Sequence, residues 1–380
     1  MTTVAELYGH EAVEAYSPPS VAATGSNPGL LMGMEIEAEH MPHADRWYRD
    51  RIDTLGWNVT TDGSLRGQNN ERRAGIGFEP GNAYEFVSRP MRQADLIWSV
   101  RAFMQATGIT QDAFSSDRTS IHVHVNCQDK DFGFIRSLVY LYAVMEQCIF
   151  QFIGHDRANN IYCVPLSSTN LLNRINGFLR SPDNLAGSWI KYTSLNFCPL
   201  SEYGTVEFRH MHGTTDVEKL TKWMNIIGRL FRKAEMPFKD LREEIFSLNT
   251  TSAYERLFRD IFADDVPYDQ AYVALLEEGV LAAKLTEAKV VAPVRETTVA
   301  AAPGGLWRNW DEPEVYEDIV PPPAARVNVA PELQGFVNQL IAERRERDRR
   351  FLAQVAAAPA VPRPEPPARP VVRNNNRGNR

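Results

Sequence analysis

The sequence predicts an α+β domain, in which a sheet packs against helices, followed by a tail of different composition. Several short segments alternate apolar and polar residues with period two, which is typical of strands with one polar face. Longer segments between them carry apolar residues at helical spacing. After about residue 290, Pro, Ala and Val accumulate, a composition that buries too little apolar area to fold alone.

The individual elements follow from these periodicities. Strands are expected at residues 34–38, 84–88, 120–126 and 205–211. Helices are expected at residues 43–55, 93–106, 134–153, 216–234, 254–262 and 269–285. Asp131 precedes the long, mostly apolar helix and is expected to cap its first turn.

Three regions are expected along the chain. Residues 1–29 hold Pro- and Gly-rich stretches and are interpreted as a flexible leader. Residues 30–290 form the folded domain. Residues 291–380 form a Pro/Ala/Arg-rich, largely disordered tail with one helix near 331–357. That helix combines an apolar stripe with an Arg-rich half, so we expect it to dock on the acidic body or to bind a partner protein.

Composition narrows the class of protein. The net charge of −7 argues against nucleic acid as the partner of the folded domain. None of the four cysteines forms a CxxC pair, so neither a zinc knuckle nor a redox motif is indicated. We find neither a signal peptide nor a stretch that would span a membrane, and therefore expect a cytoplasmic protein.

Polar residues recur two positions apart in three of the expected strands. The pairs are Glu35/Glu37, His122/His124 and Glu207/Arg209, and a fourth strand adds the single carboxylate Glu85. Because strand side chains alternate between faces, each pair projects from one face. The intervening residues would project from the opposite, apolar face; they are Ile36, Phe86, Val123 and Phe208.

Clustered carboxylates of this kind resist burial unless positive charge lies among them. A divalent cation is the simplest source of that charge, and a mostly oxygen ligand set with one imidazole suits Mg²⁺ or Mn²⁺ better than zinc. Each pair alone is compatible with a solvated strand face, a surface histidine pair or a local ion pair. The ordered combination of all of them favours a metal site.

Six short motifs, taken in order, resemble the amidoligase family of the glutamine synthetase and glutamate–cysteine ligase superfamily. They are GMEIE at 33–37, DGSL at 62–65, EFVS at 85–88, HVHV at 122–125, YTSLN at 192–196 and TVEFR at 205–209. The resemblance implies an antiparallel, partly barrel-like sheet of the glutamine synthetase catalytic type, with helices on its apolar face. It also implies that ATP phosphorylates a carboxylate and that an amine then displaces the phosphate.

The resemblance further implies a role for each matching residue. Glu35 and Glu37 would bind different ions, with Glu85 sharing one ion, and His124 and Glu207 the other. Arg209 would contact the γ-phosphate, and His122 would orient a ligand or contact the nucleotide. Asp62 would lie near the incoming amine and aid its deprotonation, and Lys191 and Asn196 would lie on the substrate side. Lys191 stands where the family pattern has Arg, so a bidentate fork is lost there.

The cofactors and partners implied are ATP, two or more Mg²⁺ or Mn²⁺ ions, and an amino acid, peptide or protein carboxylate together with an amine or ammonia. A glutamine amidotransferase partner is left open as the source of ammonia. Two alternatives remain at this point. One is a metal-dependent hydrolase of the amidohydrolase type, which also uses an HxH strand. The other is a non-catalytic interaction protein, such as a virion-associated one, on the same fold.

Overall fold

The structure, a computed structural model, describes residues 2–18, 25–69, 81–169, 171 and 184–291. These residues lie within one compact unit that runs from Met1 to Pro293. The tail expected over residues 291–380, with its helix near 331–357, lies outside the described residues apart from its first position. No helix in the described part of the chain is both long and apolar enough to cross a membrane.

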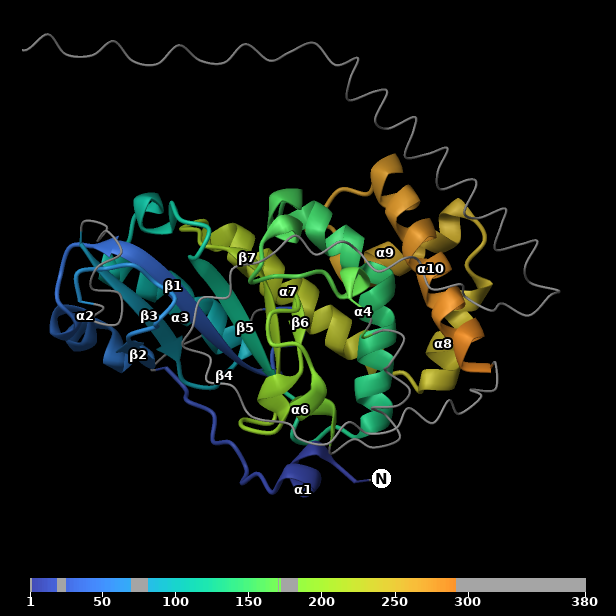
Figure 1. Cartoon of the computed structure of the whole chain (residues 1–380), viewed down its shortest axis with the longest axis horizontal. Coiled ribbons are helices and arrows are strands. Elements are labelled where there is room, and N and C mark those ends of the chain that lie inside the picture. The colour runs from blue at the N-terminus through green and yellow to red at the C-terminus, as the bar shows by residue number, and fades with distance from the viewer. Residues whose placement is uncertain (1, 19–24, 70–80, 170, 172–183, 292–380) are drawn as a thin grey trace, which may run out of the picture. The chain divides into compact units, whose positions relative to one another are not determined.

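The described strands form one seven-stranded sheet in the order β2–β3–β1–β5–β7–β6, with β4 paired to β1 (Figure 1). Every pairing is antiparallel. The strands are β1 (Leu31–Met41), β2 (Trp57–Thr60), β3 (Asn82–Ser88), β4 (Met91–Arg92), β5 (Ser120–Asn126), β6 (Leu195–Asn196) and β7 (Thr205–His212). No pairing within the described ranges joins β2 to β6, so the sheet is open. The partly barrel-like closure that we expected is therefore wrong for this part of the chain.

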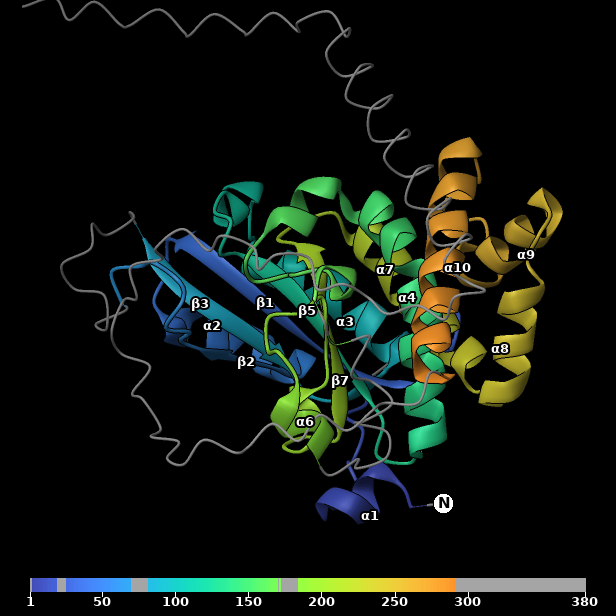
Figure 2. The ribbon, with the colours of Figure 1, turned by 45° about the vertical axis from the view of Figure 1, so that its right-hand side comes forward.

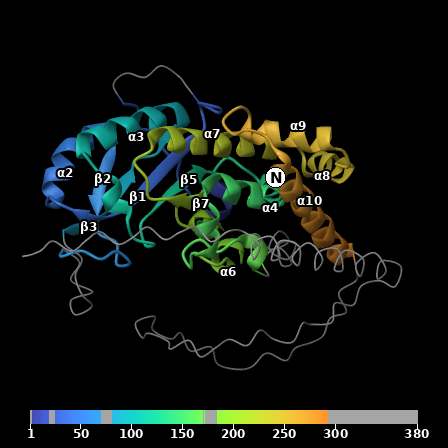
Figure 3. The same cartoon turned by 90° about the horizontal axis from the view of Figure 1, so that it is seen from above.

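Helices cover one face of the sheet, and a second group of helices packs beside them (Figures 2 and 3). The first group comprises α2 (Asp45–Ile52), α3 (Gln93–Thr107), α4 (Phe132–Ile153) and α7 (Val217–Ala234). The second group packs against α4 and α7 and comprises α8 (Phe238–Ser247), α9 (Thr251–Phe262) and α10 (Gln270–Val291). The short helices α1 (Val4–Tyr8) and α6 (Leu185–Ser188) lie beyond the opposite end of the sheet strands from α2 (Figure 1).

The apolar face of the sheet forms the core, as the alternation predicted. Fully buried side chains cover it from β1, β3, β5 and β7; they are Ile36, Phe86, Val123 and Phe208. The Phe86 ring packs on Phe103 of α3 with centroids 5.2 Å apart. The Phe208 ring lies 6.0 Å from Trp223 of α7. Burial of this apolar face drives the sheet onto the helices and leaves the polar face of the sheet for other contacts.

Local signals for the long helix α4 are confirmed, whereas several strand bounds differ from expectation. The Asp131 carboxylate accepts a hydrogen bond from the Phe134 amide at 2.9 Å, which caps α4. Strand β1 is longer than expected, and β2, β4 and β6 were not expected. Strand β2 nevertheless alternates buried and exposed residues over its four positions, so its period-two signal was present in the sequence.

The N-terminal segment is packed rather than loosely held over residues 2–18. Thr3 and Glu6 form a reciprocal capping box at α1, and the Val4 side chain is fully buried. The Val4 amide donates to the Lys130 carbonyl at 2.9 Å. The Pro- and Gly-rich composition suggested a flexible leader and did not indicate the short helix α1, which is held by the buried side chain of Val4.

Candidate active site

Strand register brings the polar pairs together on the face of the sheet opposite the helices. Glu37 of β1 lies directly across from Glu85 of β3, and Glu35 lies across from His122 of β5. His124 lies across from Glu207 of β7. Because directly opposed residues share a face, these side chains from four neighbouring strands must meet there.

Three of these residues form a first ligand group, namely Glu35, His124 and Glu207. Each offers one ligand atom, and the three atoms lie within 4.8 Å of one another. The His124 Nδ1 lies 3.0 Å from the Thr205 hydroxyl, which orients the ring. Its Nε2 lies 3.2 Å from Glu35 Oε1, yet it is buried without a hydrogen bond of good geometry in the described structure. An imidazole nitrogen held in this way is placed as a metal ligand would be.

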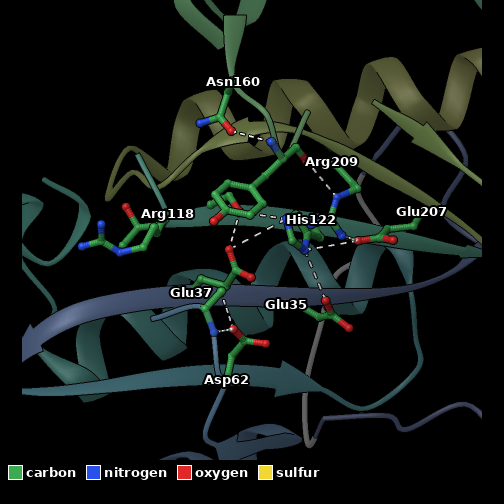
Figure 4. Close-up of polar contacts among 12 residues, drawn as sticks. Glu35, Glu37, Asp62, Arg118, His122, Asn160, Glu207 and Arg209 are labelled. Atoms are coloured by element: carbon green, nitrogen blue, oxygen red, sulfur yellow. Dashed lines mark hydrogen bonds and ion pairs between the residues drawn. The ribbon is translucent and has the colours of Figure 1, made fainter. Parts of the chain in front are cut away.

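A second ligand group consists of Glu37, Asp62 and Glu85, whose ligand atoms also lie within 4.8 Å of one another. Asp62 comes from the loop after β2, and the Ser64 amide donates to its Oδ1 at 2.6 Å. Figure 4 shows Asp62 and Glu37 beside each other, with Glu35 next along the same strand. We expected Asp62 near the amine; its carboxylate is also within reach of an ion held by the other two.

His122 lies between the two groups and is almost fully buried (Figure 4). Its Nδ1 is 3.3 Å from Glu35 Oε2 and 3.2 Å from Glu207 Oε1. Its Nε2 is 2.8 Å from the hydroxyl of Ser120, which also donates to Glu37. The His122 ring therefore links both groups. Of the two roles that we expected for His122, these contacts favour orienting the neighbouring carboxylates over binding the nucleotide.

Arg209 lies beside the first group, two residues after Glu207 on the same face of β7, and a bulge follows at this point of the strand. One β5 residue, His122, lies opposite the two residues Arg209 and His210. The Arg209 guanidinium pairs with Glu207 and donates from Nε to the Tyr162 carbonyl at 3.1 Å. Strand alternation keeps Arg209 on the polar face, whereas His210 points into the core, where its Nε2 lies 2.8 Å from the Tyr142 hydroxyl. Burial, with help from a nearby arginine, lowers the pKa of His210 to about 3, so this ring is neutral and structural.

A second, buried arginine holds the main chain of Arg209 in place. No pattern in the sequence indicated this contact. Arg157 is fully buried, and its Nη2 donates to the Arg209 carbonyl at 3.1 Å. The segment that carries Arg157 and Tyr162 thus contacts both the main chain and the side chain of Arg209. No periodicity marks such loop contacts, so only the structure reveals them.

Electrostatics differ between the two ligand groups. Burial raises the pKa of Glu35 and Glu207, but the neighbouring histidines, and Arg209 for Glu207, outweigh burial and hold both below the ordinary value. In the second group, burial raises the pKa of Glu37. Burial, followed by the charges of Glu35, Asp62 and Glu37, raises the pKa of Glu85 to about 8. Within the described part of the chain, the second group therefore lacks sufficient positive charge, as expected of carboxylates arranged for a cation.

The buried carboxylate of Glu39, by contrast, has its negative charge compensated by a neighbouring arginine. Glu39 continues the alternation of Glu35 and Glu37 along β1 and is fully buried. Arg118 binds both of its oxygens, each at 3.0 Å, and the Arg66 amide donates to it as well. Glu39 is thus neutralised by an arginine, whereas no Lys or Arg among the described residues forms an ion pair with Glu37 or Glu85.

The remaining two expected residues lie on the β6 side. The Asn196 amide donates to Glu207 Oε2 at 2.6 Å, so Asn196 holds the Glu207 carboxylate in place. Lys191 is exposed, with its ammonium 5.9 Å from the centre of the Tyr192 ring. The Arg209 guanidinium lies 5.9 Å from the same ring, so both cations flank Tyr192. The structure does not bring Lys191 to either ligand group.

Comparison with known proteins gives one family match. A sequence model of the family described as "Putative amidoligase enzyme" matches residues 30–230. No curated protein sequence matches the chain. A solved structure described as "Crystal structure of novel glutamine synthase homolog" is similar at 13% sequence identity and a TM-score of 0.25. That alignment covers 70% of this chain and 68% of the other.

Proposed function

Because the chain belongs to the amidoligase family, we propose that it is a carboxylate–amine ligase that uses ATP to form an amide bond through an acyl phosphate. One observation carries the proposal: two groups of three ligand side chains converge on one sheet face, with an arginine at their edge. We further propose that the open antiparallel sheet corresponds to the catalytic sheet of the glutamine synthetase type.

The residues present fit two divalent cations. Glu35, His124 and Glu207 would hold one ion, and Glu37 with Glu85 the other. The fit rests on the buried His124 Nε2, which has no hydrogen bond of good geometry among the described residues, and on the raised pKa of Glu85. A largely oxygen ligand set favours Mg²⁺ or Mn²⁺. When bound, such ions would neutralise phosphate oxygens and orient the nucleotide.

The side chains have separate tasks in the proposed reaction. A carboxylate oxygen of the substrate attacks the γ-phosphorus of ATP, and ADP leaves with the electrons of the broken P–O bond. Arg209 stabilises the transferring phosphoryl group. Among the described residues, its contacts to Glu207 and Tyr162 use Nη1 and Nε, so Nη2 of the guanidinium can reach a phosphate oxygen. His122 and Asn196 keep Glu35 and Glu207 in place.

The second step forms the amide. The lone pair of the amine attacks the acyl carbon, and phosphate leaves with the bonding electrons. The nitrogen must lose a proton, and we propose that Asp62 takes it, because its carboxylate lies beside Glu85 at the edge of the second group. Amide bond formation is therefore assigned to the same sheet face as phosphoryl transfer.

The arrangement does not support the amidohydrolase alternative. Enzymes of that type place their HxH strand in a parallel barrel, whereas every strand pair in the described sheet is antiparallel. The two functions also differ in their products. We propose a screen of carboxylates and amines with Mg²⁺ or Mn²⁺ and ATP, in which ADP and phosphate appear only when both a carboxylate and an amine are present. Cleavage of amides by water without ATP would instead identify a hydrolase.

A further inference from the structure

A pocket of about 570 Å³ opens beside the ligand groups, where β1 and β7 begin and β3 and β5 end. This volume lies in the range of sites for small organic molecules. At its inner end, the pocket reaches Glu35, Glu85 and His124. The proposed reaction centre is thus open to a molecule much larger than ammonia.

The outer rim of the pocket is acidic. Glu11 of the N-terminal segment and Glu202, before β7, line it and are exposed. Among the described residues that line the pocket, none is Lys or Arg. The cations of the site, Arg209 and Lys191, lie instead beside Tyr192. Positive charge and rim carboxylates therefore occupy different sides of the site, and the pocket side favours a positively charged ligand.

The walls of the pocket include apolar side chains. Val13, Leu31, Val87 and Pro90 line it, together with polar residues such as Asn126 and Thr205. Gly33 lies directly across from His124 on the polar face and adds no side chain, which leaves the floor open. A hydrocarbon stem would be buried here, with its two ends at different carboxylates.

The rim is held in a fixed position by the packed N-terminal segment. His10 donates from Nε2 to the Leu200 carbonyl at 2.7 Å, and the Tyr16 amide donates to the Pro90 carbonyl at 2.8 Å. Gly204 has φ +68°, and a Cβ there would approach His10 and Gln128 too closely. The wall of the pocket is thus preorganised, which reduces the conformational entropy lost on ligand binding.

We propose that this pocket binds the amine substrate and that this substrate is a primary amine with a second positive charge on its stem, such as an aliphatic diamine or polyamine. The inference rests on the proposed ligase function. With ions bound, the inner carboxylates are neutralised, so the inner end receives the amine that reacts. Glu11 and Glu202 hold no ion in this assignment, and they pair with the second ammonium.

Three molecules with the same six-carbon stem test the proposal by titration calorimetry on the full chain with Mn²⁺ at low salt. They are 1,6-diaminohexane, hexylamine and 6-aminohexanoate. We expect the diamine to bind about fivefold more tightly than hexylamine, since two exposed ion pairs each contribute modestly. The amino acid should bind most weakly, because its carboxylate would meet the acidic rim. Equal affinities for the three would overturn the proposal.

A pair of matched variants tests whether the rim carboxylates cause the preference for the diamine over hexylamine. The double variant Glu11→Gln/Glu202→Gln should bind the diamine and hexylamine equally while leaving hexylamine binding unchanged. The control Glu14→Gln/Glu243→Gln removes two exposed carboxylates that do not line the pocket, and it should retain the diamine preference. A preference that survives in the rim variant, or is lost in the control, would contradict the assignment.

The experiments can distinguish failure of the diamine-pocket proposal from failure of the ligase proposal. ATP-dependent phosphate release, measured on the same samples, reports on the ligase function alone. A diamine preference without ATP cleavage would leave the pocket assignment standing and overturn the ligase. ATP cleavage that depends on other amines, without a diamine preference, would overturn the pocket assignment and leave the ligase standing.

Discussion

Glu37 and Glu85 lie directly opposite each other on the antiparallel strands β1 and β3, with their side chains on the same face of the sheet. Like charges in this position destabilise a sheet. Asp62 joins them from the loop after β2. The arrangement is costly for the protein alone, and the proposed cation would offset that cost. Several of the predictions below follow from it.

The first prediction concerns stability without metal. Glu85→Gln should raise the free energy of unfolding by on the order of 1 kcal/mol in EDTA at pH 8, because it removes one of the repelling charges. Mn²⁺ should then stabilise the variant less than the wild type. Urea denaturation with and without Mn²⁺ measures both effects, with Glu14→Gln as the exposed control. A metal-free variant less stable than wild type would argue against a repelling pair.

The second prediction concerns pH. The pKa of Glu85 is raised to about 8 by burial and by neighbouring carboxylates. Its neutral form is therefore favoured in the folded protein, and its contribution to stability is greatest below about pH 4.5 and declines as pH rises through about 8. Mn²⁺ competes with this proton, so Mn²⁺ affinity should increase between pH 6 and 8 with release of a proton. Calorimetry in buffers of different ionisation enthalpy counts that proton. A flat profile, or one unchanged in Glu85→Gln, would exclude Glu85 as the group that titrates.

The third prediction concerns Arg209. Arg209→Lys should lower turnover by on the order of 100-fold, because Lys keeps the charge but lacks the planar fork that contacts Glu207, Tyr162 and a phosphate oxygen together. Thermal denaturation should show a folded variant, and the exposed Arg49→Lys serves as the control. Normal turnover in Arg209→Lys would remove this residue from phosphoryl transfer.

The fourth prediction separates two roles of Asp62. If Asp62 accepts the proton of the amine, Asp62→Asn should lose amide formation with alkylamines. It should still trap the acyl phosphate as a hydroxamate with hydroxylamine, which is largely neutral at pH 7 and needs no base. Mn²⁺ stoichiometry should stay unchanged. Loss of one bound ion together with the hydroxamate would instead show that Asp62 is chiefly a ligand of the second ion.

Part of this site could be read from the sequence, because strand alternation fixes which side chains share a face. The pairs Glu35/Glu37 and His122/His124 needed only this period of two. Their division into two groups depends on register across separate strands, which no single segment specifies. Asp62 enters the second group from a loop, where no periodicity applies.

Other features depended on tertiary contacts. The bulge in β7 breaks the alternation after His210, so that His210 and Met211 both face the core. Arg157 reaches Arg209 from a distant segment. The packing of Val4 and the pocket rim formed by Glu11 could not be inferred from a Pro- and Gly-rich segment.

The origin of the phosphate oxygens tests the central claim most directly. The reaction is run with Mn²⁺, ATP and a carboxylate and amine identified in the screen, in water enriched in ¹⁸O, and the released phosphate is analysed by mass spectrometry. An acyl phosphate intermediate transfers a carboxylate oxygen to phosphate, so the account predicts phosphate without water-derived ¹⁸O. One ¹⁸O atom per phosphate would show that water attacks ATP and would contradict the ligase.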